Sequence, residues 1–169
     1  MEFRFRLSSK HLMLASPILK KMYSGAWKEA TNRNEEGLFL WQIDAFFEPE
    51  AFTIVMNVIH GRNRKVPRHI ELETLAKVAV VTDYLQCHEA MDMFSNTWIC
   101  HLKDLLPDKY CRELVLWIMI SSIFYEHDIF RSTTHTAILK SHEKIPAFDL
   151  PIHDSIIGKL SDFSSALIV

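Results

Sequence analysis

One short segment of the chain has side chains that could together bind a catalytic metal. His88, Glu89 and Asp92 lie in the sequence His-Glu-Ala-Met-Asp. The zinc-protease helix motif has a second histidine where Asp92 stands, and a carboxylate is also a zinc ligand. A metal-dependent hydrolase is therefore one interpretation. We favour the other, the first turn of an ordinary amphipathic helix, in which Glu89 and Asp92 interact favourably with the helix dipole.

Two Cys-His steps, Cys87-His88 and Cys100-His101, suggest a second metal hypothesis. Structural zinc sites usually bring their ligands together in close pairs across a tight turn, whereas adjacent residues on a helix project about 100° apart. Cys111 makes the number of cysteines odd, which does not indicate a disulfide framework. We therefore expect buried or half-buried thiols.

Motifs for other kinds of catalysis do not occur in the sequence. The four glycines, Gly25, Gly37, Gly61 and Gly158, form neither a Walker loop nor a dinucleotide fingerprint. No serine lies in a Gly-x-Ser-x-Gly elbow. We therefore expect a protein that is not an enzyme, with no catalytic residue, no cofactor and no metal.

The densest positive charge lies in a connecting segment that contains Arg62, Arg64, Lys65 and Arg68. These side chains could bind phosphate, so binding of a nucleic acid or another anion is an alternative function. No aromatic residue is interleaved to stack on bases, and the formal net charge of the chain is −2. We favour a solvated basic loop and do not expect a nucleic-acid partner.

Composition and hydropathy indicate a globular intracellular protein. Hydrophobic residues make up 49% of the 169 residues and charged residues 24%. The longest nearly apolar run, Leu114–Phe124, is shorter than the ~20 residues that span a bilayer. The charged start, Met1–Arg6, does not resemble a secretory signal. We expect a cytoplasmic or nuclear location and no membrane partner.

Hydrophobic periodicity predicts a few short strands among several helices. In Phe3–Ser8 apolar and polar residues alternate, which favours a half-buried strand. Leu38–Ile43 is predicted as a second strand, and a short edge strand is expected around Val66. Leu114–Ile120 is apolar on all sides, which is typical of a buried helix but leaves a β segment open.

Capping residues and apolar spacing predict the helices. Ser8 and Ser9 offer hydroxyl caps to a short helix in which Leu12, Leu14 and Ala15 can point inward. Ser16 caps the next helix, and Gly25 ends it in the left-handed conformation. The predicted helices are Lys10–Ala15, Pro17 to Gly25, Pro49–Ile59, one from Leu72, one from Ala90 to Leu105, Tyr110–Glu126, His127–Lys140 and Ile152–Leu167.

Three segments resemble a known family. The first runs from Phe5 to Met22, Phe-Arg-Leu-Ser-Ser-Lys-His-Leu-Met-Leu-Ala-Ser-Pro-Ile-Leu-Lys-Lys-Met, and Ile59–Arg68 and Leu72–His88 follow in order. Together they resemble a BTB/POZ domain of the version common among fungal proteins, over roughly residues 3–104. The resemblance implies an α+β, two-layer fold, with a short mixed sheet flanked by helices. We expect this domain over residues 1–106, and an α-helical C-terminal extension over residues 107–169.

The resemblance also implies a function. BTB/POZ domains are non-enzymatic interaction modules that self-associate through their first helices, and many recruit cullin-type ubiquitin ligase scaffolds or transcriptional partners. It therefore implies a homodimeric scaffold or adaptor, with a cullin scaffold as a further partner. The candidate dimer residues are Phe3, Phe5, Leu12, Met13, Ile18, Leu19 and Met22.

One departure from the family affects the expected sheet. The family usually has a strand before the one at Phe3–Ser8, and only Met1 and Glu2 precede it here. The expected sheet is one strand short, and an uncovered edge strand has unpaired backbone groups that can pair with a second chain. We therefore expect association through this edge or the neighbouring helices.

Overall fold

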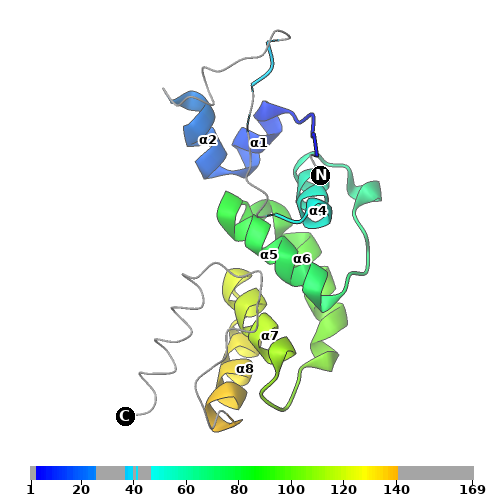
Figure 1. The fold of residues 1–169 in the computed structure, drawn as a ribbon, viewed down its shortest axis with the longest axis vertical. Helices are drawn as coiled ribbons and strands as arrows, with labels where there is room; N and C mark the ends of the chain where they lie inside the picture. The colour runs from blue at the N-terminus through cyan, green and yellow to red at the C-terminus, as the bar shows by residue number, and fades with distance from the viewer. Residues whose placement is uncertain (1–2, 26–36, 40, 42–46, 141–169) are drawn as a thin grey trace. The chain divides into compact units, whose positions relative to one another are not determined.

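The computed structural model describes residues 3–25, 37–39, 41 and 47–140 (Figure 1). Of these residues 72% are helical, and none lies in a strand. The predicted α+β fold with a mixed sheet is therefore wrong for the described residues, which are all-α. The elements are the α-helices α1 (Ser9–Ala15), α2 (Pro17–Ser24), α4 (Pro49–Ile59), α5 (Leu72–Leu85), α6 (His88–Leu102), α7 (Arg112–Ile123) and α8 (His127–Lys140), and the 3-10 helices η1 (Asn63–Lys65) and η2 (Lys103–Leu105).

The predicted strand at Phe3–Ser8 does not form, because alternation gives a segment two faces but does not supply a neighbouring strand. Residues 3–8, called segment 3–8 below, are neither helix nor strand. The edge strand expected at Val66 is also wrong, since Val66 follows η1 and its N–H bonds the Asn63 carbonyl at 3.3 Å. Half of the second predicted strand, Leu38–Ile43, lies outside the described residues, namely residues 40, 42 and 43.

The chain folds into two compact units, each made of two stretches of sequence. Unit 1 contains residues Met1–Arg68 and Val81–Phe94, and unit 2 contains His69–Val80 and Ser95–Val169. The predicted domains, 1–106 and 107–169, stay a prediction.

The corner between α1 and α2 is fixed by one buried serine in unit 1. The Ser16 hydroxyl accepts a hydrogen bond from the Leu19 N–H at 3.0 Å, as the predicted cap requires, and Pro17 occupies the first turn. The same hydroxyl donates to the Leu85 carbonyl at 2.5 Å. Ser8 makes no such cap bond to α1, and Gly25 is not left-handed, since its φ is −99°. Both of those predictions are wrong.

Helix α4 forms as predicted and supplies much of the core of unit 1. Pro49 lies in the first turn, where its missing N–H costs nothing, and Glu50 beside it favours the positive end of the helix dipole. Gly61 follows the helix with φ +65°, the left-handed region that favours glycine. The buried side chains are Ala51, Phe52, Ile54, Val55, Met56, Val58 and Ile59.

In unit 2 the segment Leu114–Ile120 is a helix with every side chain buried, which excludes the β alternative. Helices α7 and α8 pack against each other, and Leu114, Ile118 and Ala137 form a buried cluster between them (Figure 1). The helices predicted at Tyr110–Glu126 and His127–Lys140 are thus confirmed. The helix predicted at Ile152–Leu167 lies outside the described residues.

An ion pair links α5 to the start of α7 within unit 2. Arg112 Nη2 donates to Glu73 Oε2 at 3.2 Å, and Arg112 Nη1 also contacts Glu73 Oε1. Two parallel contacts of this kind fix the geometry of an Arg–carboxylate pair. Among the described residues no helix is both long enough and apolar enough to span a membrane.

We expect Ser16→Ala to destabilise the protein by about 2 kcal/mol, because it removes a helix cap and leaves the buried Leu85 carbonyl and Leu19 N–H without their partner. Ser24→Ala is the matched control. The Ser24 hydroxyl is exposed and bonds only the Lys20 carbonyl of its own helix, so the cost should stay within about 0.5 kcal/mol. Urea unfolding measures both, and equal stabilities would contradict the role given to Ser16.

Candidate functional site

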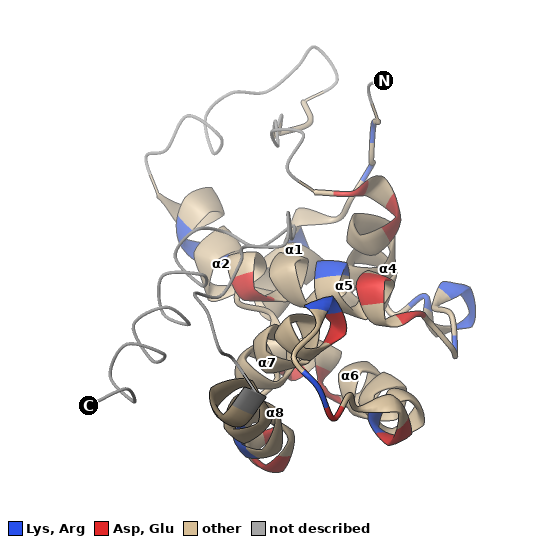
Figure 2. Ribbon diagram, turned by 60° about the horizontal axis from the view of Figure 1, so that its bottom comes forward, with Lys and Arg blue, Asp and Glu red and all other residues tan. Residues whose placement is uncertain are grey.

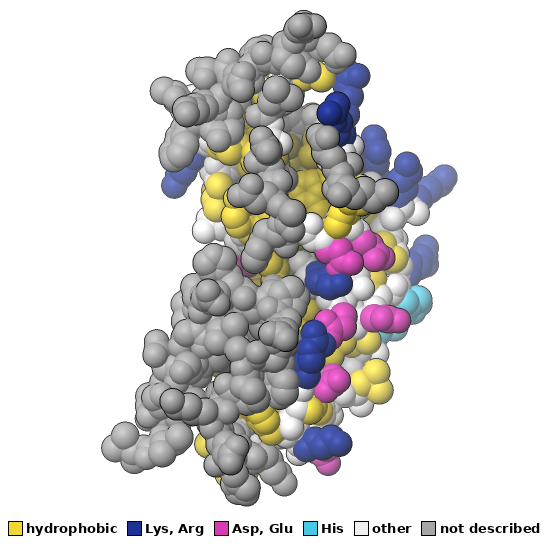
Figure 3. Space-filling model, viewed as in Figure 1, with side chains coloured by type: hydrophobic (Ala, Val, Ile, Leu, Met, Phe, Trp, Pro, Cys, Tyr) yellow, Lys and Arg dark blue, Asp and Glu magenta, His cyan; other side chains and the backbone are white. Residues whose placement is uncertain are grey.

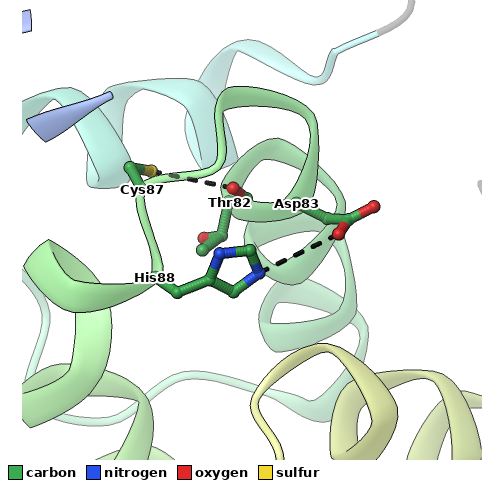
Figure 4. Close-up of polar contacts among 4 residues, drawn as sticks. All are labelled: Thr82, Asp83, Cys87 and His88. Atoms are coloured by element: carbon green, nitrogen blue, oxygen red, sulfur yellow. Dashed lines mark hydrogen bonds and ion pairs between the residues drawn. The ribbon is translucent and has the colours of Figure 1, made fainter. Parts of the chain in front are cut away.

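The structure does not group the predicted metal residues into a ligand set. His88 begins α6, and its Nε2 faces Asp83 Oδ1 at 3.9 Å (Figure 4). Glu89 and Asp92 are exposed on the following turn. Among the residues that the structure describes, no three His, Cys, Asp or Glu side chains lie where they could hold a metal ion together.

The three cysteines are free thiols in different surroundings. Cys87 is buried and its Sγ lies 3.8 Å from the Thr82 carbonyl, to which it donates (Figure 4). Burial raises the pKa of Cys87 to about 12, although its backbone hydrogen bond lowers that pKa to a smaller extent. Burial also raises the pKa of the half-buried Cys111. Cys100 is exposed, so the expectation of a buried or half-buried thiol is wrong there.

The basic residues lie where the sequence predicts an exposed loop. Arg62, Arg64, Lys65 and Arg68 are all exposed on or beside the short η1 turn. This turn is closed by a hydrogen bond from the Lys65 N–H to the Arg62 carbonyl at 2.8 Å, and the buried side chain of Val66 anchors it.

The predicted interface residues divide between the surface and the interior of unit 1. Leu12 and Leu19 are 2% and 1% exposed, so they belong to the core of the unit. Phe3, Phe5 and Ile18 are exposed by 54%, 42% and 37% of their area. Met13 and Met22 are half-buried. Without Leu12 and Leu19, the accessible part of the predicted interface is smaller than the sequence suggests.

Leu14 faces solvent, although the sequence predicts that it faces the core. It was expected to point inward with Leu12, but it is 87% exposed. Residues two apart on a helix project about 200° from each other, so Leu12 and Leu14 cannot both face the core. This geometry, applied to α1 alone, identifies Leu14 as an exposed leucine.

Segment 3–8 is held against α4 by one ring contact and one histidine. Phe5 meets Phe52 edge-on, with ring centroids 5.0 Å apart. The Ser8 N–H donates to His60 Nε2 at 3.0 Å, and His60 Nδ1 lies 2.8 Å from the Met56 carbonyl. A carbonyl only accepts and a backbone N–H only donates, so this arrangement requires a neutral His60 with its proton on Nδ1.

Two open grooves lie beside these residues in unit 1. The first, of about 400 Å³, lies along segment 3–8 and α4. Its lining includes the apolar residues Phe3, Phe5 and Ile54 and the charged residues Arg4, Glu50 and Lys65. The second, of about 560 Å³, is called the α1–α2 groove below. It is lined by Lys10, Met13, Leu14, Pro17 and Lys20.

Positive charge lies beside both grooves, although Glu50 also lines the first one. Residues 3–25 contain five Lys and Arg and no Asp or Glu. In Figure 2 the ribbons of α2 and of the segment before α1 carry blue bands and no red. On the face drawn in Figure 3, hydrophobic side chains of the upper part are exposed between groups of Lys and Arg.

Comparison with known proteins found no significant match to a family model, a curated protein or a solved structure.

The cysteines should differ in their rates of alkylation. Because the thiolate is the reactive form, native protein treated with iodoacetamide near pH 8 should be modified first at Cys100, more slowly at Cys111, and at Cys87 only after unfolding. Peptide mass spectrometry over time measures the three rates. Fast native labelling of Cys87 would contradict its burial.

His60→Phe should release segment 3–8 while keeping an aromatic ring beside His11, whose ring stacks on His60 at 5.3 Å. The Ser8 N–H then loses its acceptor, and its exchange with deuterium should be faster. Hydrogen exchange followed by NMR measures this, and His69→Phe, at an exposed histidine outside this contact, is the control. Unchanged protection at Ser8 would show that His60 does not anchor the segment.

Proposed function

We propose that this chain is a protein-interaction module that self-associates as a homodimer through segment 3–8. The observation that carries the proposal is where exposed apolar side chains gather. Of the ten large hydrophobic side chains exposed in the described residues, four lie between residues 3 and 18, namely Phe3, Phe5, Leu14 and Ile18. Exposed apolar side chains concentrated in this way mark surfaces that bind other proteins.

Segment 3–8 offers backbone groups as well as aromatic rings. Within the described residues, Phe3, Phe5, Arg6 and Leu7 make no main-chain hydrogen bond. In an antiparallel pair of two such segments, Phe3 of one copy would lie beside Leu7 of the other, and the two Phe5 rings would lie side by side. Two-fold symmetry repeats the Phe3–Leu7 contact, and the pair of Phe5 rings lies on the axis.

The charges give the homodimer a distinctive salt dependence. Arg4 and Arg6 alternate with the apolar residues, so the same pairing places arginines of the two copies opposite one another. Like charges repel, and salt screens exposed charges. Self-association should therefore become tighter as salt is raised.

The resemblance to BTB/POZ domains supports a scaffold or adaptor role. Its first segment, Phe5–Met22, includes most of residues 3–18, where the exposed apolar side chains lie. The three free cysteines are in keeping with an intracellular location, where thiols stay reduced. Binding to a cullin scaffold stays a prediction of the resemblance alone.

Phe3→Ser should weaken the dimer about 30-fold. Burying the exposed half of the ring is worth about 1 kcal/mol, and the two-fold axis doubles this to about 2 kcal/mol. Sedimentation velocity over a concentration series gives the dissociation constant.

Leu105→Ser is the matched control, because Leu105 is 74% exposed but lies in η2, outside unit 1. It should leave the dimer unchanged. A wild-type chain that sediments as a monomer at tens of micromolar would refute the homodimer, and an unchanged Phe3→Ser dimer would refute its assignment to segment 3–8.

A further inference from the structure

We infer that the α1–α2 groove docks an acidic amphipathic helix of another protein. The inference rests on the proposal that unit 1 is a protein-interaction module, but it does not depend on self-association. It concerns a different surface from segment 3–8, since the described residues that line the groove belong to α1 and α2.

The groove has an apolar side that its described residues leave exposed. Leu14, at 87%, has the largest exposed fraction among the large hydrophobic side chains of the described residues. Met13 and Pro17 lie beside it. Methionine is unbranched and flexible, so it adapts to the shape of an apolar partner. Burying these apolar side chains would supply most of the binding free energy of a partner.

The backbone around the groove limits the ways in which a partner can bind. Both walls are helices, which offer no extended backbone edge. A partner therefore cannot add as a strand here, and recognition must come from side chains. An amphipathic helix that lays its apolar face into a groove is the binding mode that fits.

The charge of the rim determines the chemistry of the partner. Lys10 comes from α1 and Lys20 from α2, and none of the described residues that line the groove is acidic. Lys21 follows in α2, and no Asp or Glu occurs between residues 3 and 25. A second copy would bring the same lysines to this surface, whereas a helix with carboxylates beside its apolar stripe would pair with them. Charge complementarity thus favours an acidic partner over a second copy.

An anionic membrane also attracts lysines beside exposed apolar residues. The groove is concave, however, with Lys10 and Lys20 on separate helices around Leu14, and such a hollow fits one helix better than a flat lipid surface. Lipid binding is therefore one outcome that the test must distinguish.

The probe is a fluorescent helical peptide about 18 residues long, long enough to form a helix, with a leucine stripe flanked by glutamates. A matched peptide has lysine at each glutamate position. Fluorescence anisotropy should show that the acidic peptide binds at least about tenfold more tightly than the basic one, and more weakly as salt is raised.

Charge reversal locates the site. Lys10→Glu/Lys20→Glu should lose at least about tenfold in affinity for the acidic peptide and gain affinity for the basic one. Arg64→Glu/Lys65→Glu changes the net charge equally in the exposed basic loop and should keep the acidic preference. Circular dichroism confirms that each variant is folded.

Three results would overturn the inference: equal binding of the two peptides or binding of neither, an acidic preference that survives Lys10→Glu/Lys20→Glu, or binding to phosphatidylserine vesicles as tight as to the acidic peptide. Sedimentation of the same variants keeps the two proposals separate. Lys10→Glu/Lys20→Glu should still form the dimer, and Phe3→Ser should still bind the acidic peptide. The opposite salt dependences of dimer and peptide binding separate the two surfaces a second time.

Discussion

The buried hydroxyl of Ser16 determines which side chains of the first two helices reach the surface. It accepts from the Leu19 N–H and donates to the Leu85 carbonyl, so it joins the α1–α2 corner to the end of α5 inside unit 1. With the corner fixed, Leu12 and Leu19 face the interior, and Leu14 and Ile18 face outward. A buried hydroxyl has no water to bond and must find its partners in the protein. The α1–α2 corner is therefore held in one geometry as well as stabilised.

The helices could be predicted from the sequence because their signals are local. Pro49 and Gly61 bracket α4, Ser16 and Pro17 begin α2, and the apolar spacing from Leu72 gives α5. Strands need a partner far along the chain, and no local pattern supplies one. Segment 3–8 has the alternation of a strand, yet in the described residues it contacts the Phe52 ring of α4 and His60, which follows that helix. That is why the fold class was predicted wrongly while most helices were predicted correctly.

The candidate surface could be predicted only in part, for a related reason. The sequence identifies an apolar region between Phe3 and Met22, but burial depends on which face each helix turns to its neighbours. Ile18 and Leu19 are adjacent and equally apolar, and the bond between Ser16 and Leu85 puts only Leu19 inside. The position of Leu14 could have been found from helical geometry, whereas the His60 bond to Ser8 spans 52 residues and has no local signal.

The charge of residues 3–25 explains why this apolar surface stays exposed. A folded domain usually buries large apolar side chains. A second copy of the chain would bury Leu14 or Phe3 if it packed against this surface. Five cations and no carboxylate in this stretch work against its pairing with the same stretch of a second copy, because that approach brings like charges together. Pairing of two copies then depends on the close contacts of segment 3–8, whereas an acidic partner gains both apolar contact and charge neutralisation at Lys10 and Lys20. The cations of residues 3–25 thus select partners by charge, whereas the exposed apolar side chains supply most of the binding free energy.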